Sequence, residues 1–209
     1  MFMAVREGHL ECVQELLKAG VNPNRSIFNR FSSVQVAAMK GNDRILVELL
    51  NYGGEINMRL KPSDIPETIR TSHGPLFIAV VYSHLNCFKT LLLYGSDPDY
   101  NCPDLELLQM LKKPRTIMEM CLKSGQRAPF VKLLIEFGAN MHLIDDCVIK
   151  QIMYNEALEV FLQGKARPRT LMSQCRLSIR KHLRHVRKMT LIHQLDVPQE
   201  LIRYLKHET

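Results

Sequence analysis

Residues Ala4–Asn24 read AVREGHLECVQELLKAGVNPN, and the same pattern returns 33 residues later as AAMKGNDRILVELLNYGGEIN, over Ala37–Asn57. Both copies contain a first apolar segment, a glycine, a second segment with a Leu-Leu pair, a closing glycine and an asparagine. Two more copies follow as PLFIAVVYSHLNCFKTLLLYGSDPD, over Pro75–Asp99, and TIMEMCLKSGQRAPFVKLLIEFGAN, over Thr116–Asn140. Self-similarity of this kind predicts a stacked repeat architecture.

Each copy predicts a pair of short helices. The two apolar segments are split at Gly41 in the second copy and at Ser83 in the third. The second segments end at glycines, where a left-handed cap needs a residue without a Cβ; these are Gly20, Gly53, Gly95 and Gly138. One helix pair cannot bury its own apolar face, so neighbouring pairs must stack into an all-α solenoid.

The 33-residue period, together with the L-L-x-x-G close, resembles the ankyrin repeat, although SSVQ, GPLF and TIME replace its T-P-L-H start. The resemblance implies about four repeats. Cys147–Gln163 is expected to form a degenerate closing unit that seals the end of the stack. Gly164 and Pro168 are expected to mark a boundary, which gives an ankyrin domain over 1–164 and a second module over 165–209.

Two insertions, Arg59–Ser72 and Tyr100–Lys112, precede the first helices of the third and fourth repeats. In solenoids such insertions often lie on a binding face, yet long surface loops also cost little entropy. Both interpretations stay open. The chain opens at Met1 inside the first predicted helix, so the outer face of the first repeat is expected to be exposed. The candidate contacts to a target protein are loop residues near the fingers: Phe28, Arg30, Arg70, His73 and Tyr100.

The last 45 residues, 165–209, are called the tail here. The net charge of the chain is +7, and the tail holds 11 of the 28 Lys and Arg but 3 of the 21 Asp and Glu. Two apolar clusters interrupt its basic sequence, and a segment this short is not expected to bury both in a core of its own. The first cluster is Leu171, Cys175, Ile179 and Leu183, and the second is Ile192, Leu195, Val197, Pro198, Leu201, Tyr204 and Leu205.

The two clusters resemble the two halves of a SOCS box. The pattern T-L-x-x-x-C-R-x-x-I-R, beginning at Thr170, is similar to the half that docks elongin C. The pattern I-x-x-L-x-V-P-x-x-L-x-x-Y-L, beginning at Ile192, is similar to the half that selects a cullin. Asp196 replaces the first proline of the usual L-P-Φ-P element. Ankyrin repeats followed by these half-motifs resemble the ankyrin-repeat and SOCS-box family, with a three-helix SOCS box.

That resemblance implies an adaptor without catalytic activity, metal or cofactor of its own. The ankyrin face would hold an unknown substrate protein, and the tail would hold elongin B/C and cullin-5 with its RING subunit, leading to ubiquitination and proteasomal degradation. Leu171, Cys175 and Ile179 are the residues expected to bind elongin C. Leu195, Val197, Pro198 and Tyr204 are the residues expected to bind the cullin.

Two alternatives are open at this point. The tail could be a plain C-terminal cap of an ankyrin scaffold that assembles no ligase. The run Lys165–Lys188, with nine Lys and Arg and no acid, could instead bind nucleic acid through phosphate contacts. Against nucleic acid, the cations interleave with an apolar stripe and no aromatic residue occurs from Gln163 through Gln199. A solvated positive face on a docking helix is therefore the favoured interpretation.

Other function classes find little support in the sequence. None of the common hydrolase, zinc-protease or nucleotide-binding motifs is present. His182, His185 and His193 have no cysteine or carboxylate nearby at metal-ligand spacing and are expected to be surface histidines. The six cysteines form no C-x-x-C pair, which favours a reducing compartment, the cytosol or the nucleus. The longest stretch without Asp, Glu, Lys or Arg, Thr71–Phe88, is too polar for a membrane span.

Overall fold

A computed structural model describes the chain except for residues 25–30, 58–73, 100–115, 124–126, 186–188 and 209. The described residues form helices and connecting turns without strands, as predicted for an all-α protein. They divide into two compact units, Met1–Ser96 and Asp97–Thr209, and each is described by itself.

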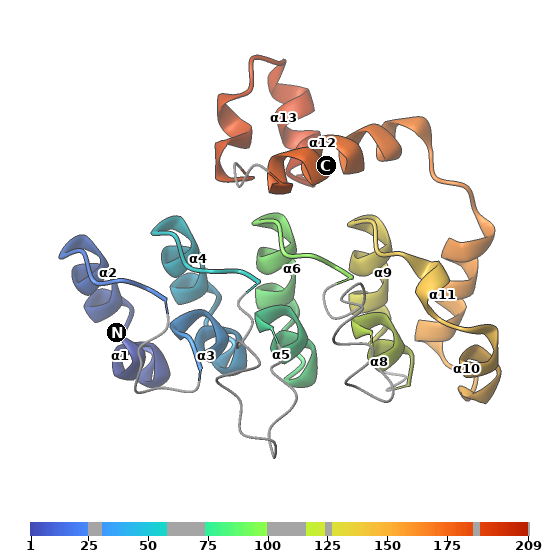
Figure 1. Cartoon of the computed structure of the whole chain (residues 1–209), viewed down its shortest axis with the longest axis horizontal. Helices are drawn as coiled ribbons and strands as arrows, with labels where there is room; N and C mark the ends of the chain where they lie inside the picture. The colour runs from blue at the N-terminus through green and yellow to red at the C-terminus, as the bar shows by residue number, and fades with distance from the viewer. Residues whose placement is uncertain (25–30, 58–73, 100–115, 124–126, 186–188, 209) are drawn as a thin grey trace. The chain divides into compact units, whose positions relative to one another are not determined.

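The described residues of the first unit form three helix pairs (Figure 1). First helices pack against first helices and second against second, so equivalent apolar positions meet in one layer. Leu46, Leu49, Phe88 and Leu91 are fully buried in that layer. The pairs are α1 (Phe2–Glu7) with α2 (Leu10–Lys18), α3 (Ser33–Lys40) with α4 (Asp43–Asn51), and α5 (Pro75–Val81) with α6 (Leu85–Leu93).

Every second helix of a repeat ends in the predicted left-handed glycine turn. The four closing glycines have φ between 82° and 96°. In the second repeat the Gly53 N–H donates to the carbonyl of Leu50 (3.1 Å) and the Gly54 N–H to that of Leu49 (2.8 Å). This pair of hydrogen bonds is a Schellman motif, which satisfies carbonyls left open at the helix end.

The altered starts of the second and fourth repeats still cap their helices, whereas the N-cap of the third repeat, Gly74, has no side chain to do so. In the second repeat Ser32 Oγ accepts from the Gln35 N–H (3.1 Å), and the Gln35 side-chain oxygen accepts from the Ser32 N–H (2.8 Å). In the fourth repeat Thr116 Oγ1 accepts from the Glu119 N–H (2.9 Å). A short polar side chain at the N-cap stabilises a helix start, so the second and fourth repeats keep this stabilisation without the T-P-L-H sequence.

The first described helices of the second unit form a fourth pair, and the unit continues into the tail. Helix α11 packs against both helices of the fourth pair and buries Ala157, Leu158 and Phe161 there, as expected for a closing unit. Helix α10 buries no side chain. The elements are α8 (Ile117–Lys123), α9 (Ala128–Glu136), η2 (Met141–Leu143), α10 (Asp146–Gln151), α11 (Glu156–Ala166), α12 (Leu171–His185), η3 (Met189–Gln194) and α13 (Gln199–Leu205).

Gly164 does not interrupt the chain where the sequence suggested. It lies inside α11, which ends only at Ala166. A Cβ built on Gly164 would lie 2.7 Å from Cδ1 of Ile135 in α9. The glycine is therefore explained by the close approach of two helices, and α11 ends two residues later at Ala166, before Pro168.

Candidate partner-docking surface of the tail

The described residues of the tail form three helical segments, α12, η3 and α13, of which the middle one is a 3-10 helix. They enclose a small apolar core against which Leu195 also packs. The core forms because the chain turns back and brings α13 against α12. It takes in only part of each apolar cluster, since Leu171, Ile179, Val197 and Leu201 stay exposed, as expected for a segment this short. The core residues are Leu183, Met189, Ile192, Ile202 and Leu205.

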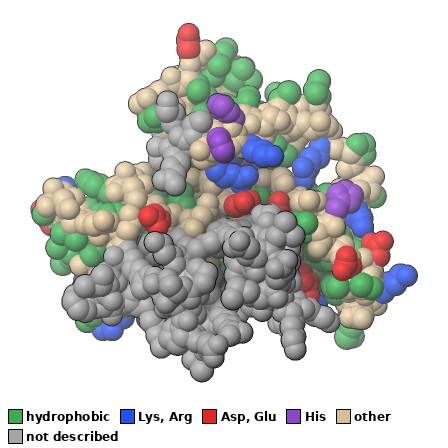
Figure 2. Space-filling view, in the orientation of Figure 1, with side chains coloured by type: hydrophobic (Ala, Val, Ile, Leu, Met, Phe, Trp, Pro, Cys, Tyr) green, Lys and Arg blue, Asp and Glu red, His purple; other side chains and the backbone are tan. Residues whose placement is uncertain are grey.

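One face of α12 carries exposed apolar side chains. Leu171 is 76% exposed and Ile179 is 43% exposed, and Cys175 lies between them, also exposed. Met172, which was not among the residues predicted to bind elongin C, adds to this face. Figure 2 shows hydrophobic side chains, in green, on the outer surface of the tail at the top of the view. The structure thus brings together the three residues predicted to bind elongin C.

Leu183 leaves this stripe although it continues the four-residue spacing. Four residues exceed one helical turn by about 40°, so each step moves the side chain further around the helix. Leu171 consequently faces outward, whereas Leu183 lies in the tail core. We refer to Leu171, Met172, Cys175 and Ile179 as the outer face of α12.

The residues predicted to contact a cullin differ in their exposure to solvent. Val197 and Pro198 are exposed at the start of α13, where Pro198 is the N-cap. Leu195 is partly buried against the tail core. Tyr204 is partly buried beneath the guanidinium of Arg176, whose Cζ lies 4.4 Å from the ring centroid.

Two arginines on the inner side of α12 are themselves buried. Arg176 is 8% exposed and Arg180 is 6% exposed. Arg180 Nη1 donates to the carbonyl of Leu205 (2.7 Å) and Arg176 Nη1 to that of Tyr204 (3.5 Å). Cations suit these carbonyls because they end α13, where the helix dipole is negative. The expected solvated positive face was therefore wrong for these two residues.

Burial and the neighbouring cations of Arg176 and Arg184 lower the pKa of Arg180 to about 10. The guanidinium remains charged at neutral pH even so. It is held by the Leu205 carbonyl and by the ring of Phe137, whose centroid lies 5.0 Å from Cζ. Its charge serves internal packing and contributes little to the outer surface.

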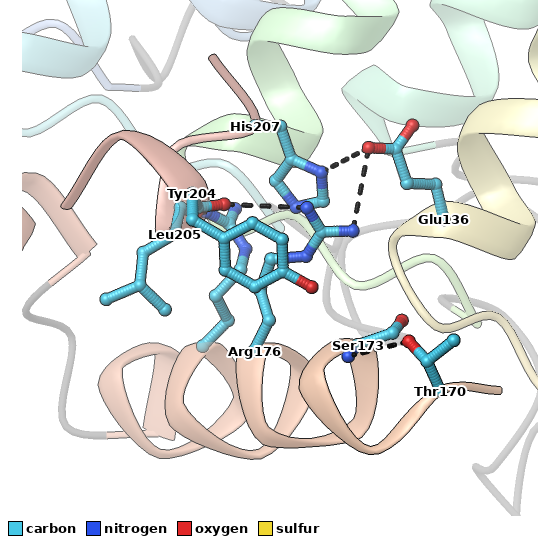
Figure 3. Close-up of polar contacts among 8 residues, drawn as sticks. Glu136, Thr170, Ser173, Arg176, Tyr204, Leu205 and His207 are labelled. Carbon is cyan, nitrogen blue, oxygen red and sulfur yellow. Dashed lines mark hydrogen bonds and ion pairs between the residues drawn. The ribbon is translucent and has the colours of Figure 1, made fainter. Parts of the chain in front are cut away.

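At the C-terminal end of α9, Arg176 and His207 meet Glu136 in a compact polar cluster, shown in Figure 3. The His207 ring stacks on Phe137 with centroids 3.9 Å apart, and its Nδ1 lies 2.5 Å from Oε1 of Glu136. Arg176 Nη2 lies 3.7 Å from the same carboxylate oxygen. We call the group Glu136, Phe137, Arg176, Arg180 and His207 the joint.

Acidification is expected to weaken the joint. Burial lowers the pKa of His207 below its ordinary value of 6.5, and Arg176 and Arg180 lower it further, although the hydrogen bond to Glu136 acts in the opposite direction. The unfolded chain therefore takes up a proton at a pH where the packed ring does not. The stabilisation is complete above the unfolded value and is lost as the pH falls below it.

The measurement is the thermal midpoint of the chain between about pH 7.5 and about pH 5.5, a range in which histidine titrates. The midpoint should decline more in the wild type than in His207→Gly, which lacks the ring. Equal declines in the two proteins would contradict the assignment to His207. His193, an exposed residue of η3, supplies a matched control as His193→Ala.

The remaining predictions concern contacts to a target protein, histidines, metal sites and membrane spans. Phe28, Arg30, Arg70, His73 and Tyr100 lie outside the described residues, as do both insertions. His182, His185 and His193 are exposed. Within the described ranges no group of three or more His, Cys, Asp or Glu side chains could hold a metal ion, and none of the helices there is long and apolar enough to cross a membrane.

Comparison with known proteins agrees with this architecture. The family model for ankyrin repeats (3 copies) matches residues 1–104, and the model for the SOCS box matches residues 167–206. The chain is 45% identical over 164 residues to Ankyrin repeat and SOCS box protein 12 of Mus musculus, covering 78% of this chain and 53% of that protein.

A second relative is Ankyrin repeat and SOCS box protein 1 of Homo sapiens, 36% identical over 167 residues, which covers 74% of this chain and 49% of that protein. The chain thus spans about half the length of these curated relatives. Both halves of the architecture, the repeats and the tail, have separate matches, and the relatives carry both. The chain belongs to the ankyrin-repeat and SOCS-box family.

Proposed function

We propose that this chain is a substrate-recognition adaptor of an elongin B/C–cullin–RING ubiquitin ligase. The observation that carries the proposal is that the two faces of α12 differ in exposure. On the inner face the side chains of Arg176, Arg180 and Leu183 are buried. On the outer face those of Leu171, Cys175 and Ile179 are exposed. An exposed apolar stripe on an otherwise well-packed helix is typical of a protein–protein interface.

The chemistry of the outer face suits a helix-binding pocket on elongin C. Burying a leucine side chain contributes about 1.5–3 kcal/mol, and a few such anchors dominate the affinity of most interfaces. Cys175 lies one turn from Leu171, and its small side chain allows the partner to approach closely. No redox or catalytic chemistry is required of the thiol.

The start of α13 is the proposed contact for cullin-5. Val197 and Pro198 are exposed next to each other, and Leu201 continues the apolar surface one turn further on. Leu195 and Tyr204 support this surface from their partly buried positions. Asp196, also exposed, places a charge at the edge of the contact.

In this proposal other proteins carry out ubiquitin transfer, and the adaptor supplies proximity. Holding a target beside the ligase replaces a chance encounter by a high effective concentration. The target would bind to the ankyrin repeats in the cytosol or nucleus and be marked for degradation. The adaptor itself needs no cofactor or metal for this role.

The decisive experiment is co-expression of the full chain with elongin B and elongin C, followed by affinity purification and size-exclusion chromatography. A stoichiometric ternary complex is expected. A chain that elutes without elongin B/C would contradict the proposal and favour the plain ankyrin scaffold.

Val197→Asp is expected to weaken binding of cullin-5 without affecting binding of elongin B/C. It places a charge on the exposed start of α13 while leaving the outer face of α12 unchanged. Binding of cullin-5 to the purified ternary complex should weaken by about tenfold or more, equivalent to at least about 1.4 kcal/mol, while elongin B/C is retained. The measurement is calorimetric titration with cullin-5, and an unchanged affinity would place the cullin contact elsewhere.

Nucleic-acid binding by the tail is disfavoured by how its cations are used. Arg176 and Arg180 are buried, and Arg184 Nη1 lies 3.2 Å from Oδ1 of Asp97. Arg169 Nη2 donates to the carbonyl of Ala139 (3.2 Å), and Lys165 pairs with Asp146 (3.0 Å). Cations engaged in this way are poorly placed to neutralise phosphates.

A further inference from the structure

We infer that the joint positions the fourth repeat relative to the ligase, with Glu136 and His207 as positioning residues for ubiquitin transfer. The inference rests on the proposed function, because it gives the joint a role only if the outer face of α12 carries the ligase. It goes further by assigning a task to residues that do not bind either partner.

The tip of α9 differs from the equivalent turns of the other repeats. Two residues before the closing glycine the first three repeats carry Lys18, Asn51 and Leu93, whereas the fourth carries Glu136. The turn itself is the same, since the Gly138 N–H donates to the carbonyl of Ile135 (3.1 Å). The carboxylate is therefore not needed to close the helix, and its contacts with Arg176 and His207 are directed at the tail.

The end of α13 supports the same conclusion from the other side. The His207 N–H donates to the carbonyl of Tyr204 (3.2 Å), and the Glu208 N–H donates to that of Arg203 (3.0 Å). His207 thus stands where the repeats use glycine, and its φ of 57° is left-handed. Glycine would suit this backbone better. The ring, with a side chain only 2% exposed, is accounted for by its contacts with Phe137 and Glu136.

Helix α12 connects these two ends. Its inner arginines hold the last carbonyls of α13, and Arg176 and Arg180 also reach Glu136 and Phe137. A Cβ built on Gly138 would lie 2.9 Å from Cδ2 of Leu177, so the same face of α12 also seats on the turn. A protein bound to the outer face of α12 is therefore held at a fixed place relative to the fourth repeat.

This arrangement matters for a proximity mechanism. The effective concentration of one bound partner at the other depends on the range of distances and orientations that the link between them allows. If the joint opens, the tail stays attached through the chain but samples many orientations. Transfer then becomes slower and less selective among lysines, although both partners remain bound.

His207→Gly is the sharpest test because it removes the ring and relieves the left-handed backbone at once. Glu136→Ala removes the opposite partner, and His193→Ala controls for loss of an exposed histidine in the same tail. Each full-length variant is purified with elongin B/C. Dyes at the exposed Lys132 of α9 and Glu200 of α13 report their distance distribution by single-molecule energy transfer.

A second readout follows ubiquitin in the reconstituted ligase with cullin-5 and its RING subunit. Ubiquitin-remnant mass spectrometry records which lysines of the chain itself are modified. We expect His207→Gly and Glu136→Ala to keep elongin B/C, to broaden the distance distribution, and to spread modification over lysines that the wild type leaves unmodified, with total transfer reduced several-fold. His193→Ala should behave like the wild type.

The outcomes separate the two ideas. A wild-type chain that fails to retain elongin B/C overturns the proposed function and, with it, the role of the joint in a ligase. A wild type that retains elongin B/C, with His207→Gly and Glu136→Ala matching it in both distance distribution and lysine pattern, overturns the inference alone. Uniform loss of modification at every lysine, with an unchanged distance distribution, would also overturn it, since that outcome reports weaker assembly.

Discussion

Leu171→Asp combined with Cys175→Asp is expected to abolish co-purification of elongin B/C with the full chain. Both side chains lie on the outer face of α12, where the substitution disturbs no buried neighbour. Losing a central apolar anchor and burying a carboxylate in its place each cost several kcal/mol at an interface. The affinity should fall at least about a hundredfold, or about 2.7 kcal/mol.

The matched control changes the net charge equally on another side of the same helix. Gln174→Asp with Lys181→Gln also lowers the charge by two, and both residues are exposed. This double variant should retain elongin B/C, and both proteins should keep the far-ultraviolet circular dichroism of the wild type. Full retention of elongin B/C by the Leu171 and Cys175 double variant would refute the assignment of the docking surface.

Phe161→Ala is expected to destabilise the second unit by about 3–5 kcal/mol, the usual cost of deleting a buried phenylalanine side chain. Phe161 is fully buried where α11 seals the fourth repeat. A loss of this size is comparable to much of the stability of a small domain. Hydrogen exchange of the α8 and α9 amides measures it directly, because exchange reports the free energy of local opening.

The neighbouring residue provides the control for this experiment. Leu162 follows Phe161 in the same helix and takes the same substitution to alanine, yet it is 41% exposed. Leu162→Ala should therefore change the protection of α8 and α9 by less than about 1 kcal/mol, as for most surface substitutions. Similar losses in the two variants would mean that α11 does not seal the stack.

The repeat architecture was predictable because its signals are local. Gly53 and Gly138 announce a left-handed turn through their own lack of a side chain, and the Leu-Leu pairs mark the buried side of the helix before it. The outer face of α12 was predictable for the same reason, since Leu171 and Cys175 are one turn apart. Such features depend on a few consecutive residues.

The joint could not be predicted, because its contacts join distant parts of the chain. The residues that flank His207 in the sequence do not indicate that its ring is buried. A glutamate such as Glu136 near the end of a helix is common and does not indicate a long-range contact. Arg180 belongs to a basic run that predicts solvent exposure, yet the fold supplies a carbonyl and an aromatic ring that make burial favourable. The packing role of Gly164 could not be predicted for the same reason, since Ile135 lies in another helix.

The contacts of the joint link residues that are far apart in the sequence, and this affects how the chain folds. His207 and Glu136 are 71 residues apart, and the pair Arg184 and Asp97, which lies outside the joint, is 87 apart. The turns within each repeat, by contrast, close over a few residues. Loop-closure entropy makes such distant contacts late to form. Substitutions in the joint should therefore leave the folding rate of the helix pairs nearly unchanged and act mainly by accelerating release of the tail.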